Sequence, residues 1–172
     1  MTGPIVADTG PLIGLVRIGQ LSLLRDLYET VLGPPSVYEE IQASGGRPGS
    51  EALLSAIHSK WLLRVEPEPT TDLQDLLLLI DAGEAEAIVL ATQKGSRFLI
   101  IDDKRGRAVA KSRGLRIVGT GGLLLAAKQR GILPGLAPIL EQLTAIEYHL
   151  SPRLRKELLI LAGEAESGEK KS

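Results

Sequence analysis

Cysteine is absent from this chain of 172 residues, which excludes disulfides, thiolate zinc sites and cysteine nucleophiles. Only two histidines occur, and His58 and His149 lie far apart in the sequence, so a histidine-rich metal site is not expected. Aromatic residues make up 3% of the chain, so the core has to be built from Leu, Ile, Val and Ala. No basic and apolar signal opens the chain, and no uncharged apolar run is long enough for a membrane span. We therefore expect a cytoplasmic protein with no membrane partner.

Apolar residues make up 44% of the chain, and the formal net charge is -1. The apolar content is typical of a folded globular protein. The net charge argues against a protein that coats nucleic acid uniformly, although it is compatible with a local basic patch. We expect a single domain over residues 1–163 with a helical extension at its C-terminal end, and a frayed polar tail over residues 164–172.

Short apolar runs alternate with helix-like segments, which predicts an α/β fold with a central parallel sheet flanked by helices on both faces. The runs expected to form strands are 5–7, 31–32, 61–65, 98–101 and 115–118. A glycine-rich loop is expected over residues 44–50. The expected helices cover residues 12–18, 21–28, 37–42, 51–59, 73–80, 81–93, 104–113, 123–130, 139–143 and 152–161.

Acidic residues stand at the ends of apolar runs or on helix-like segments at four points: Asp8, Glu40, Glu86 and the pair Asp102–Asp103. Ligands of parallel sheets bind beyond the carboxyl ends of the strands, so Asp8 and Asp102 would meet at one edge if their strands are neighbours. Carboxylates gathered there would repel each other unless a divalent cation neutralised them. Each acid also has a structural interpretation, since Asp8 and the pair could each cap the helix that follows.

Two more acids lie close to Glu86 in the sequence. The spacing Asp81-x-x-Glu84 matches a capping box, with Asp81 as the cap and Glu84 as the third helical residue, so we interpret Glu84 as structural. Glu86 is two residues further on, about 200° around the helix, and points elsewhere. Glu39 is interpreted as part of a solvated helix face.

The segments that carry Asp8, Glu40, Glu86 and the pair Asp102–Asp103 resemble, in their order and spacing, the PIN domain, the metal-dependent nuclease fold of VapC-type toxins. The resemblance covers roughly residues 3–120 and implies a three-layer PIN-like fold and a homodimer. Residues 119–128 further resemble a PIN-like subgroup described as nucleic-acid-binding. The matching stretches are Ile5-Val6-Ala7-Asp8-Thr9, Val37-Tyr38-Glu39-Glu40-Ile41, Glu86-Ala87-Ile88-Val89-Leu90-Ala91-Thr92 and Leu99-Ile100-Ile101-Asp102-Asp103.

The resemblance also implies which residues form the site. The family's four metal-binding acids match, in order, Asp8, Glu40, Glu86 and Asp103, with Asp102 assisting. The implied cofactor is Mg²⁺ or Mn²⁺, and both ions prefer oxygen ligands. Asp8 and Asp103 would be the inner ligands. Glu40 and Glu86 would bind a second ion or orient the attacking water, and Thr9 would hydrogen-bond a carboxylate or water beside the metal.

A basic stretch without any acid follows, from residue 104 to residue 116. Lys104, Arg107 and Lys111 fall on one helix face by their i, i+3, i+7 spacing, and a phosphate backbone is their natural partner. A solvated helix face that balances acidic segments elsewhere is the other interpretation. Because aromatic residues are scarce, RNA would be recognised through its backbone and shape.

The leading functional hypothesis is a Mg²⁺- or Mn²⁺-dependent endoribonuclease that hydrolyses RNA through its carboxylates. It could be the toxin of a toxin–antitoxin pair, with an antitoxin protein as partner. The alternative is a non-catalytic nucleic-acid-binding or interaction module, because Glu86 is longer than the Asp common at its position and Ile101 stands where a hydroxyl residue is common. A phosphatase of the haloacid-dehalogenase type is disfavoured, because it requires Asp-x-Asp after the first strand and residue 10 is Gly.

Three further features of the sequence are weaker signals. Residues 119–122 (Gly-Thr-Gly-Gly) could seat a phosphate, but they lack the lysine of a P-loop, so we predict a tight turn capped by Thr120. Trp61 is predicted to lie in the core. The apolar run 73–80 is predicted to be core or a dimer face.

Overall fold

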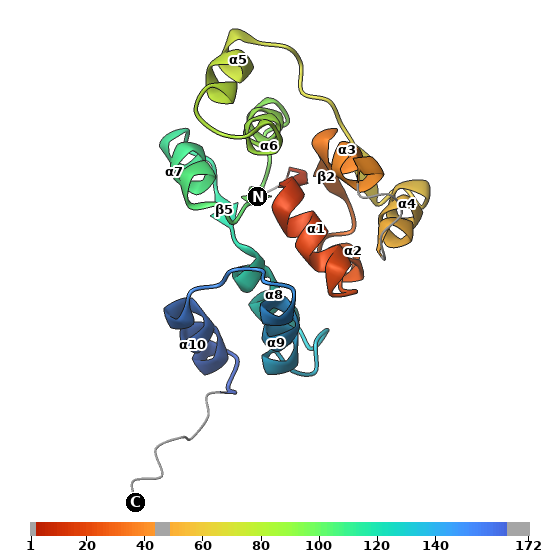
Figure 1. Cartoon of the computed structure of the whole chain (residues 1–172), viewed down its shortest axis with the longest axis vertical. Helices are drawn as coiled ribbons and strands as arrows, with labels where there is room; N and C mark the ends of the chain where they lie inside the picture. The colour runs from red at the N-terminus through yellow and green to blue at the C-terminus, as the bar shows by residue number, and fades with distance from the viewer. Residues whose placement is uncertain (1–2, 44–48, 165–172) are drawn as a thin grey trace, which may run out of the picture. The chain divides into compact units, whose positions relative to one another are not determined.

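The computed structural model of the chain describes residues 3–43 and 49–164. Most of the predicted glycine-rich loop over residues 44–50, and the predicted tail after residue 164, lie outside the described residues. Figure 1 labels the strands and helices in chain order. Short strands alternate with helices up to residue 118, and only helices follow, so the predicted α/β class is confirmed.

The described residues form five strands in one parallel sheet, with the order β3-β2-β1-β4-β5. Strand β1 pairs with β2 on one side and with β4 on the other, so Ile5 lies opposite both Val31 and Phe98. The first and fourth strands are therefore neighbours, which is the condition under which Asp8 and Asp102 were expected to meet at one edge. The strands are β1 (Ile5–Ala7), β2 (Val31–Gly33), β3 (Leu62–Arg64), β4 (Phe98–Ile100) and β5 (Ile117–Val118).

Ten helices occur in the described chain, and several begin at side chains that cap their first turn. Thr70 Oγ1 accepts a hydrogen bond from the N–H of Leu73, and Ser151 Oγ accepts one from the N–H of Leu154, both at 3.1 Å, as is typical of helix starts. The helices are α1 (Thr9–Arg17), α2 (Ser22–Tyr28), α3 (Ser36–Ala43), α4 (Ser50–His58), α5 (Thr71–Leu77), α6 (Ala82–Gln93), α7 (Lys104–Ser112), α8 (Thr120–Gln129), α9 (Ala137–Ala145) and α10 (Pro152–Leu161).

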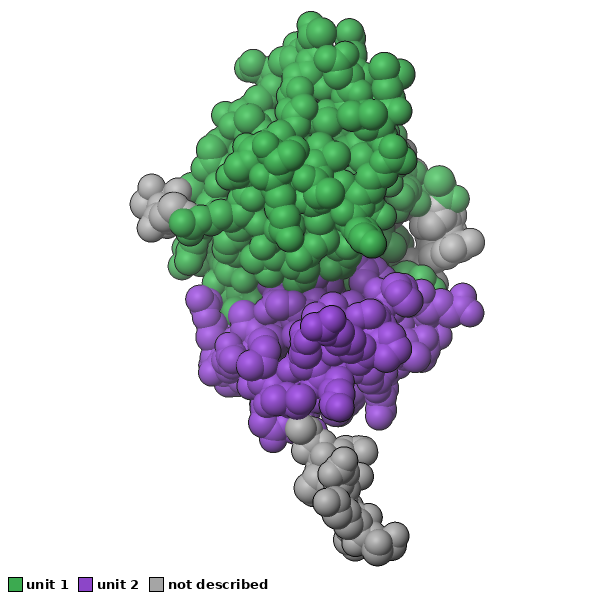
Figure 2. Space-filling model, turned by 90° about the vertical axis from the view of Figure 1, so that its left-hand side faces the viewer, with its two compact units in different colours: residues 1–119 green, residues 120–172 purple. Residues whose placement is uncertain are grey.

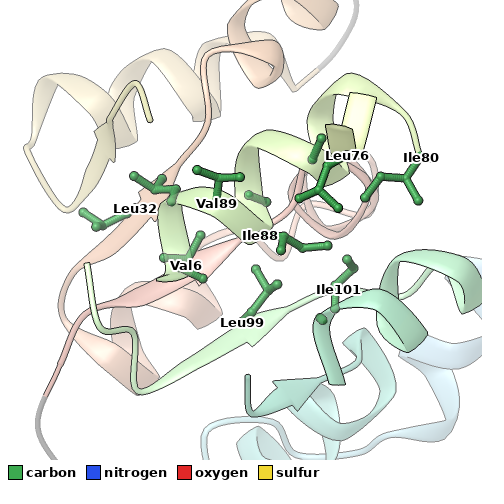
Figure 3. Packing of buried hydrophobic residues seen from close by; sticks show 13 residues of the cluster. Val6, Leu32, Leu76, Ile80, Ile88, Val89, Leu99 and Ile101 are labelled. Carbon is green, nitrogen blue, oxygen red and sulfur yellow. The ribbon is translucent and has the colours of Figure 1, made fainter. Parts of the chain in front are cut away.

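Apolar side chains bury both faces of the sheet. Successive strand residues point to opposite faces, and Figure 3 shows Val6 and Leu99 packing with Ile88 of α6 on one of them. Their neighbours Ala7 and Ile100, which point the other way, are also fully buried. Covering on both faces is what short, uniformly apolar parallel strands require. The result is the three-layer arrangement of helices around a central sheet.

The chain divides into two compact units, residues 1–119 and residues 120–172, which Figure 2 colours separately. The first unit contains the whole sheet and helices α1 to α7, and the second contains α8, α9 and α10. The boundaries of a single domain over residues 1–163 stay a prediction. Within the described ranges, no helix combines the length and the apolar character that crossing a membrane requires.

The turn predicted over residues 119–122 is wrong, because α8 already begins at Thr120. Glycine disfavours a helix locally, but tertiary packing can override this preference. A Cβ on Gly121 would lie 2.7 Å from Leu158 Cδ1, so the missing side chain lets α8 pack closely on α10. Thr120 is fully buried, and its hydroxyl lies 3.4 Å from that of Tyr148.

The other packing predictions have mixed outcomes. Trp61 is buried, as predicted, whereas the apolar run 73–80 is split. Leu76 and Ile80 join the core under the sheet, while residues 77–79 are exposed leucines. Glu164 is the first residue of the predicted tail. Its carboxylate accepts hydrogen bonds from backbone N–H groups at the start of α9.

Candidate metal centre

The candidate site lies at the carboxyl end of the sheet, between β1 and β4. The chain leaves β1 toward β2 on one side, whereas β4 joins β1 on the other side. This is a topological switch point, where open parallel sheets bind their ligands. Asp8 directly follows β1, and its backbone N–H donates to the carbonyl oxygen of Ile100 at 2.9 Å. Asp102 and Asp103 lie two and three residues after Ile100, the last residue of β4.

Asp8 is the most deeply buried acid of the site, with 4% of its surface exposed. Asp8 caps α1, which is one of the two roles predicted for it. Its Oδ1 accepts a hydrogen bond from the N–H of Thr9 at 2.7 Å. Burial raises the pKa of Asp8 to about 7, although the hydrogen bond from Thr9 opposes the change. The negative charges of Asp81, Asp102 and Glu40 raise this pKa further. These three carboxylates therefore lie near enough to Asp8 to repel it.

Glu84 is the second buried acid, with 7% of its surface exposed. Asp81 Oδ1 accepts the N–H of Glu84 at 2.9 Å, so the predicted cap of α6 is confirmed. The carboxyl group of Glu84, however, donates a hydrogen bond to Asp103 in its protonated form. Burial raises the pKa of Glu84 to about 8, and the charges of Asp81, Asp103 and Asp8 add to this effect. Glu84 is thus a member of the site that the sequence analysis missed.

A missing side chain makes this contact between α6 and α7 possible. A Cβ on Gly106, in the first turn of α7, would lie 3.3 Å from Glu84 Cδ. The same glycine donates its N–H to Asp103 Oδ2 at 3.0 Å, so Asp103 caps α7. A signal for the burial of Glu84 exists in the sequence. The helix α6 is apolar almost all round, and such helices are buried on every side.

Asp102 faces a different set of groups from Asp103. A Cβ on Gly119 would lie 3.0 Å from both Asp102 Oδ1 and Arg107 Nη1, so these two side-chain atoms border the same small space. Arg107 Nη1 also donates to the carbonyl oxygen of Ile101 at 3.0 Å. Asp102 acts electrostatically on Asp8, whereas Asp103 acts on Glu84. The pair thus contributes to the site at two positions.

The structure brings Glu40 to Asp8 but places Glu86 among other partners. Glu40 lies on α3 and is largely exposed. Partial desolvation of its carboxyl group raises its pKa, and the charge of Asp81 adds to the increase. The carboxylate of Glu86 accepts hydrogen bonds from the backbone N–H and the hydroxyl of Ser36. Burial raises the pKa of Glu86 against these hydrogen bonds, and the other contributing charges come from Glu39 and Glu66. Neither Asp8 nor the acids around Asp8 are among the causes of the pKa shift of Glu86.

The donor set fits a hard divalent cation. All the candidate ligands are carboxylates, which Mg²⁺ and Mn²⁺ prefer, and a cation would remove the repulsion that raises the pKa of Asp8 and Glu84. Within residues 3–43 and 49–164, no three or more Asp, Glu or His side chains are grouped closely enough to hold an ion as they stand.

The predicted phosphate-binding helix is α7, which starts beside the acids. Lys104 and Lys111 are exposed, and Arg107 is half-buried because it also contacts the backbone after β4. A cationic surface next to a carboxylate cluster suits a phosphodiester substrate, whose charge the lysines can balance.

Comparison with known proteins agrees with the sequence resemblance. A family model described as a PIN domain matches residues 4–164, which is nearly the whole chain. A search of curated proteins found no match. PIN domains are generally nucleases, and they generally use divalent metal ions and bind nucleic acid. The chain belongs to the PIN-domain family.

Proposed function

We propose that this PIN domain is a Mg²⁺- or Mn²⁺-dependent endoribonuclease. The observation that carries the proposal is the pair of buried carboxylates, Asp8 and Glu84, at the switch point of the sheet. The pKa of each is raised by burial and by neighbouring negative charge, to about 7 and about 8. A structural role alone does not require acids to be gathered in this way, and a divalent cation would stabilise them.

The proposed ligands are Asp8 and Asp103, as the sequence predicts, together with Glu84. Glu40 and Asp102 are the carboxylates that would bind a second ion or orient the attacking water. Glu84 takes the place that the sequence analysis gave to Glu86, because it hydrogen-bonds Asp103 and its neighbours include Asp8. The type of ligand does not change, because one glutamate of α6 takes the place of another.

The bound cation would supply a nucleophilic water and neutralise charge that develops on the phosphate. The protein's part is to hold the carboxylates in position. The N–H of Thr9 fixes one oxygen of Asp8. The N–H of Gly106 fixes one oxygen of Asp103. Lys104 and Lys111 would bind the phosphates that flank the scissile bond.

The biological setting of the proposal rests on the family resemblance. We propose RNA as substrate, a cytoplasmic location, a homodimer, and a toxin role with an antitoxin protein as partner. The second candidate function, a non-catalytic nucleic-acid-binding module, is favoured by one observation. The described carboxylates are not already grouped to hold an ion.

Cleavage of a labelled RNA with Mg²⁺, with Mn²⁺ and with EDTA tests the choice between these functions. We expect metal-dependent cleavage that Asp8→Asn and Glu84→Gln each abolish. Glu39→Gln is the matched control, because Glu39 is an exposed acid on α3, and it should keep full activity. Binding of RNA without cleavage under every divalent ion would refute the nuclease proposal and support the binding module.

A further inference from the structure

Glu86 belongs to α6, but its carboxylate lies at the start of α3. It accepts hydrogen bonds from the backbone N–H and the hydroxyl of Ser36, the first residue of α3. The two preceding residues, Pro34 and Pro35, have no N–H, so Ser36 carries the first backbone donor at this helix end. A carboxylate here satisfies that donor and interacts favourably with the positive end of the helix dipole. Glu86 therefore anchors the beginning of α3 to α6.

Ser36 in turn contacts the residue beside Asp8. Its Oγ lies 3.0 Å from Thr9 Oγ1, and the N–H of Thr9 lies 2.7 Å from Asp8 Oδ1. A Cβ on Gly83 would lie 3.0 Å from Thr9 Oγ1 and 3.2 Å from Ser36 Oγ. The first turn of α6 thus closes directly over the two hydroxyls. Glu86 thus contacts Ser36, Ser36 contacts the hydroxyl of Thr9, and the backbone N–H of the same threonine binds Asp8.

The same serine also determines where a second acid of the centre lies. Glu40 follows Ser36 by four residues on α3, one helical turn later and on the same face. An anchor at the first turn of this helix therefore fixes the direction from which Glu40 approaches Asp8. Loss of that anchor would let the first turn open, since helix ends fray when their donors are unsatisfied.

The geometry at Glu86 is costly for a residue with only a structural role. Its Oε2 is buried and, within the part of the chain that the structure describes, has no hydrogen-bond partner. A buried polar atom without a partner is destabilising. Departures of this kind concentrate at functional sites. The cost indicates that the position of Ser36 matters beyond the stability of α3.

We propose that Glu86 is a positioning residue of the metal centre, which acts through Ser36 to hold Thr9 against Asp8 and to set the turn of α3 that carries Glu40. The inference rests on the proposed function and differs from the ligand role that the sequence resemblance implies for Glu86. A ligand needs its negative charge. A positioning residue needs only an oxygen that accepts the two hydrogen bonds of Ser36, and an amide oxygen meets that need.

Two substitutions of Glu86 separate these roles, with Mn²⁺ affinity measured by electron paramagnetic resonance and RNA cleavage by steady-state kinetics. Glu86→Ala should weaken Mn²⁺ binding by about 10- to 100-fold, the usual effect of removing a group that orients metal ligands, and lower kcat at unchanged KM. Glu86→Gln should restore both to near the wild-type values. Ser36→Ala should reproduce the loss, and the double variant with Glu86→Ala should be no worse than either single change.

Matched variants and a folding check complete the experiment. Glu39→Gln removes a neighbouring charge without touching Ser36 and should change nothing, whereas Glu84→Gln should lose Mn²⁺ binding because Glu84 is a proposed ligand. Circular dichroism confirms that each variant is folded.

Three outcomes would overturn the inference. Equal losses in Glu86→Gln and Glu84→Gln would make Glu86 a ligand. Unchanged Mn²⁺ affinity and kcat in Glu86→Ala would leave it only a helix cap. A wild-type protein that binds no Mn²⁺ would refute the proposed function itself, and the positioning role with it. This last result is measured on the wild-type protein, so failure of the proposed function can be distinguished from failure of the positioning role alone.

Discussion

Replacement of Asp8 by Asn should make the metal-free protein more stable at neutral pH. The amide oxygen can still accept the hydrogen bond from the N–H of Thr9, which is 2.7 Å long with Asp8. The substitution removes a carboxylate whose pKa is raised by burial from 3.8 to about 7. At about 1.4 kcal/mol per pH unit, this difference corresponds to about 4 kcal/mol for keeping the side chain ionised in the folded protein.

The sign of the pH dependence of the free energy of unfolding follows from the number of protons that the folded and the unfolded chain bind. Between about pH 4 and pH 7, the folded chain keeps a proton on Asp8 that the unfolded chain has released. The free energy of unfolding therefore falls as the pH rises through this window and is constant above it. Asp8→Asn lacks this dependence. Relative to the wild type, its free energy of unfolding should increase by about 2–3 kcal/mol between pH 5 and pH 7.

Urea unfolding in EDTA measures this difference. Trp61 is the single tryptophan of the chain and is buried in the unit that contains the site, so its fluorescence reports unfolding of that unit. Glu39→Gln, at an exposed carboxylate, should show no such pH-dependent gain. A constant difference between Asp8→Asn and the wild type from pH 5 to pH 8 would refute the reasoning.

Three further results are expected. Mn²⁺ affinity should rise from about pH 6 to pH 8, with proton release measurable by calorimetry in buffers of different ionisation enthalpy, because Asp8 and Glu84 lose protons when a metal binds. Gly83→Ala should lower the free energy of unfolding by about 1–3 kcal/mol in the urea assay, because its Cβ would lie 3.0 Å from Thr9 Oγ1. Ile88→Ala, at a fully buried position, should cost about 2–5 kcal/mol in the same assay without changing the Mn²⁺ affinity of the protein that stays folded.

The strands and most helices could be predicted because their signals are local. Runs such as Phe98–Ile101 are apolar enough to be buried on both sides, and each ends at residues that favour a turn or a cap. The same pattern predicted that Asp8 and Asp102 meet at one edge if their strands are neighbours, and the structure places Asp8 beside Ile100. The cap at Asp81 was equally readable, because a capping box depends on residues three apart.

The contact of Glu84 with Asp103 could not be predicted from the sequence, for a physical reason. Its backbone N–H satisfies the local capping pattern, which accounts for the residue without any distant partner. Its carboxyl group approaches the first turn of α7 closely because Gly106, 22 positions along the chain, has no side chain there. The helical start at Thr120 was missed for a similar reason, since the benefit of Gly121 depends on Leu158.

The order of strands in the sheet determines when during synthesis the candidate centre can form. Strand β1 is made first, yet its partner β4 pairs Phe98 with Ile5, 93 positions later. At about 5–20 residues per second, translation of that interval takes roughly 5 to 20 seconds. Asp8 and Asp103 cannot meet before β4 has been translated. A nascent chain therefore carries no assembled carboxylate centre until most of the first unit has been synthesised.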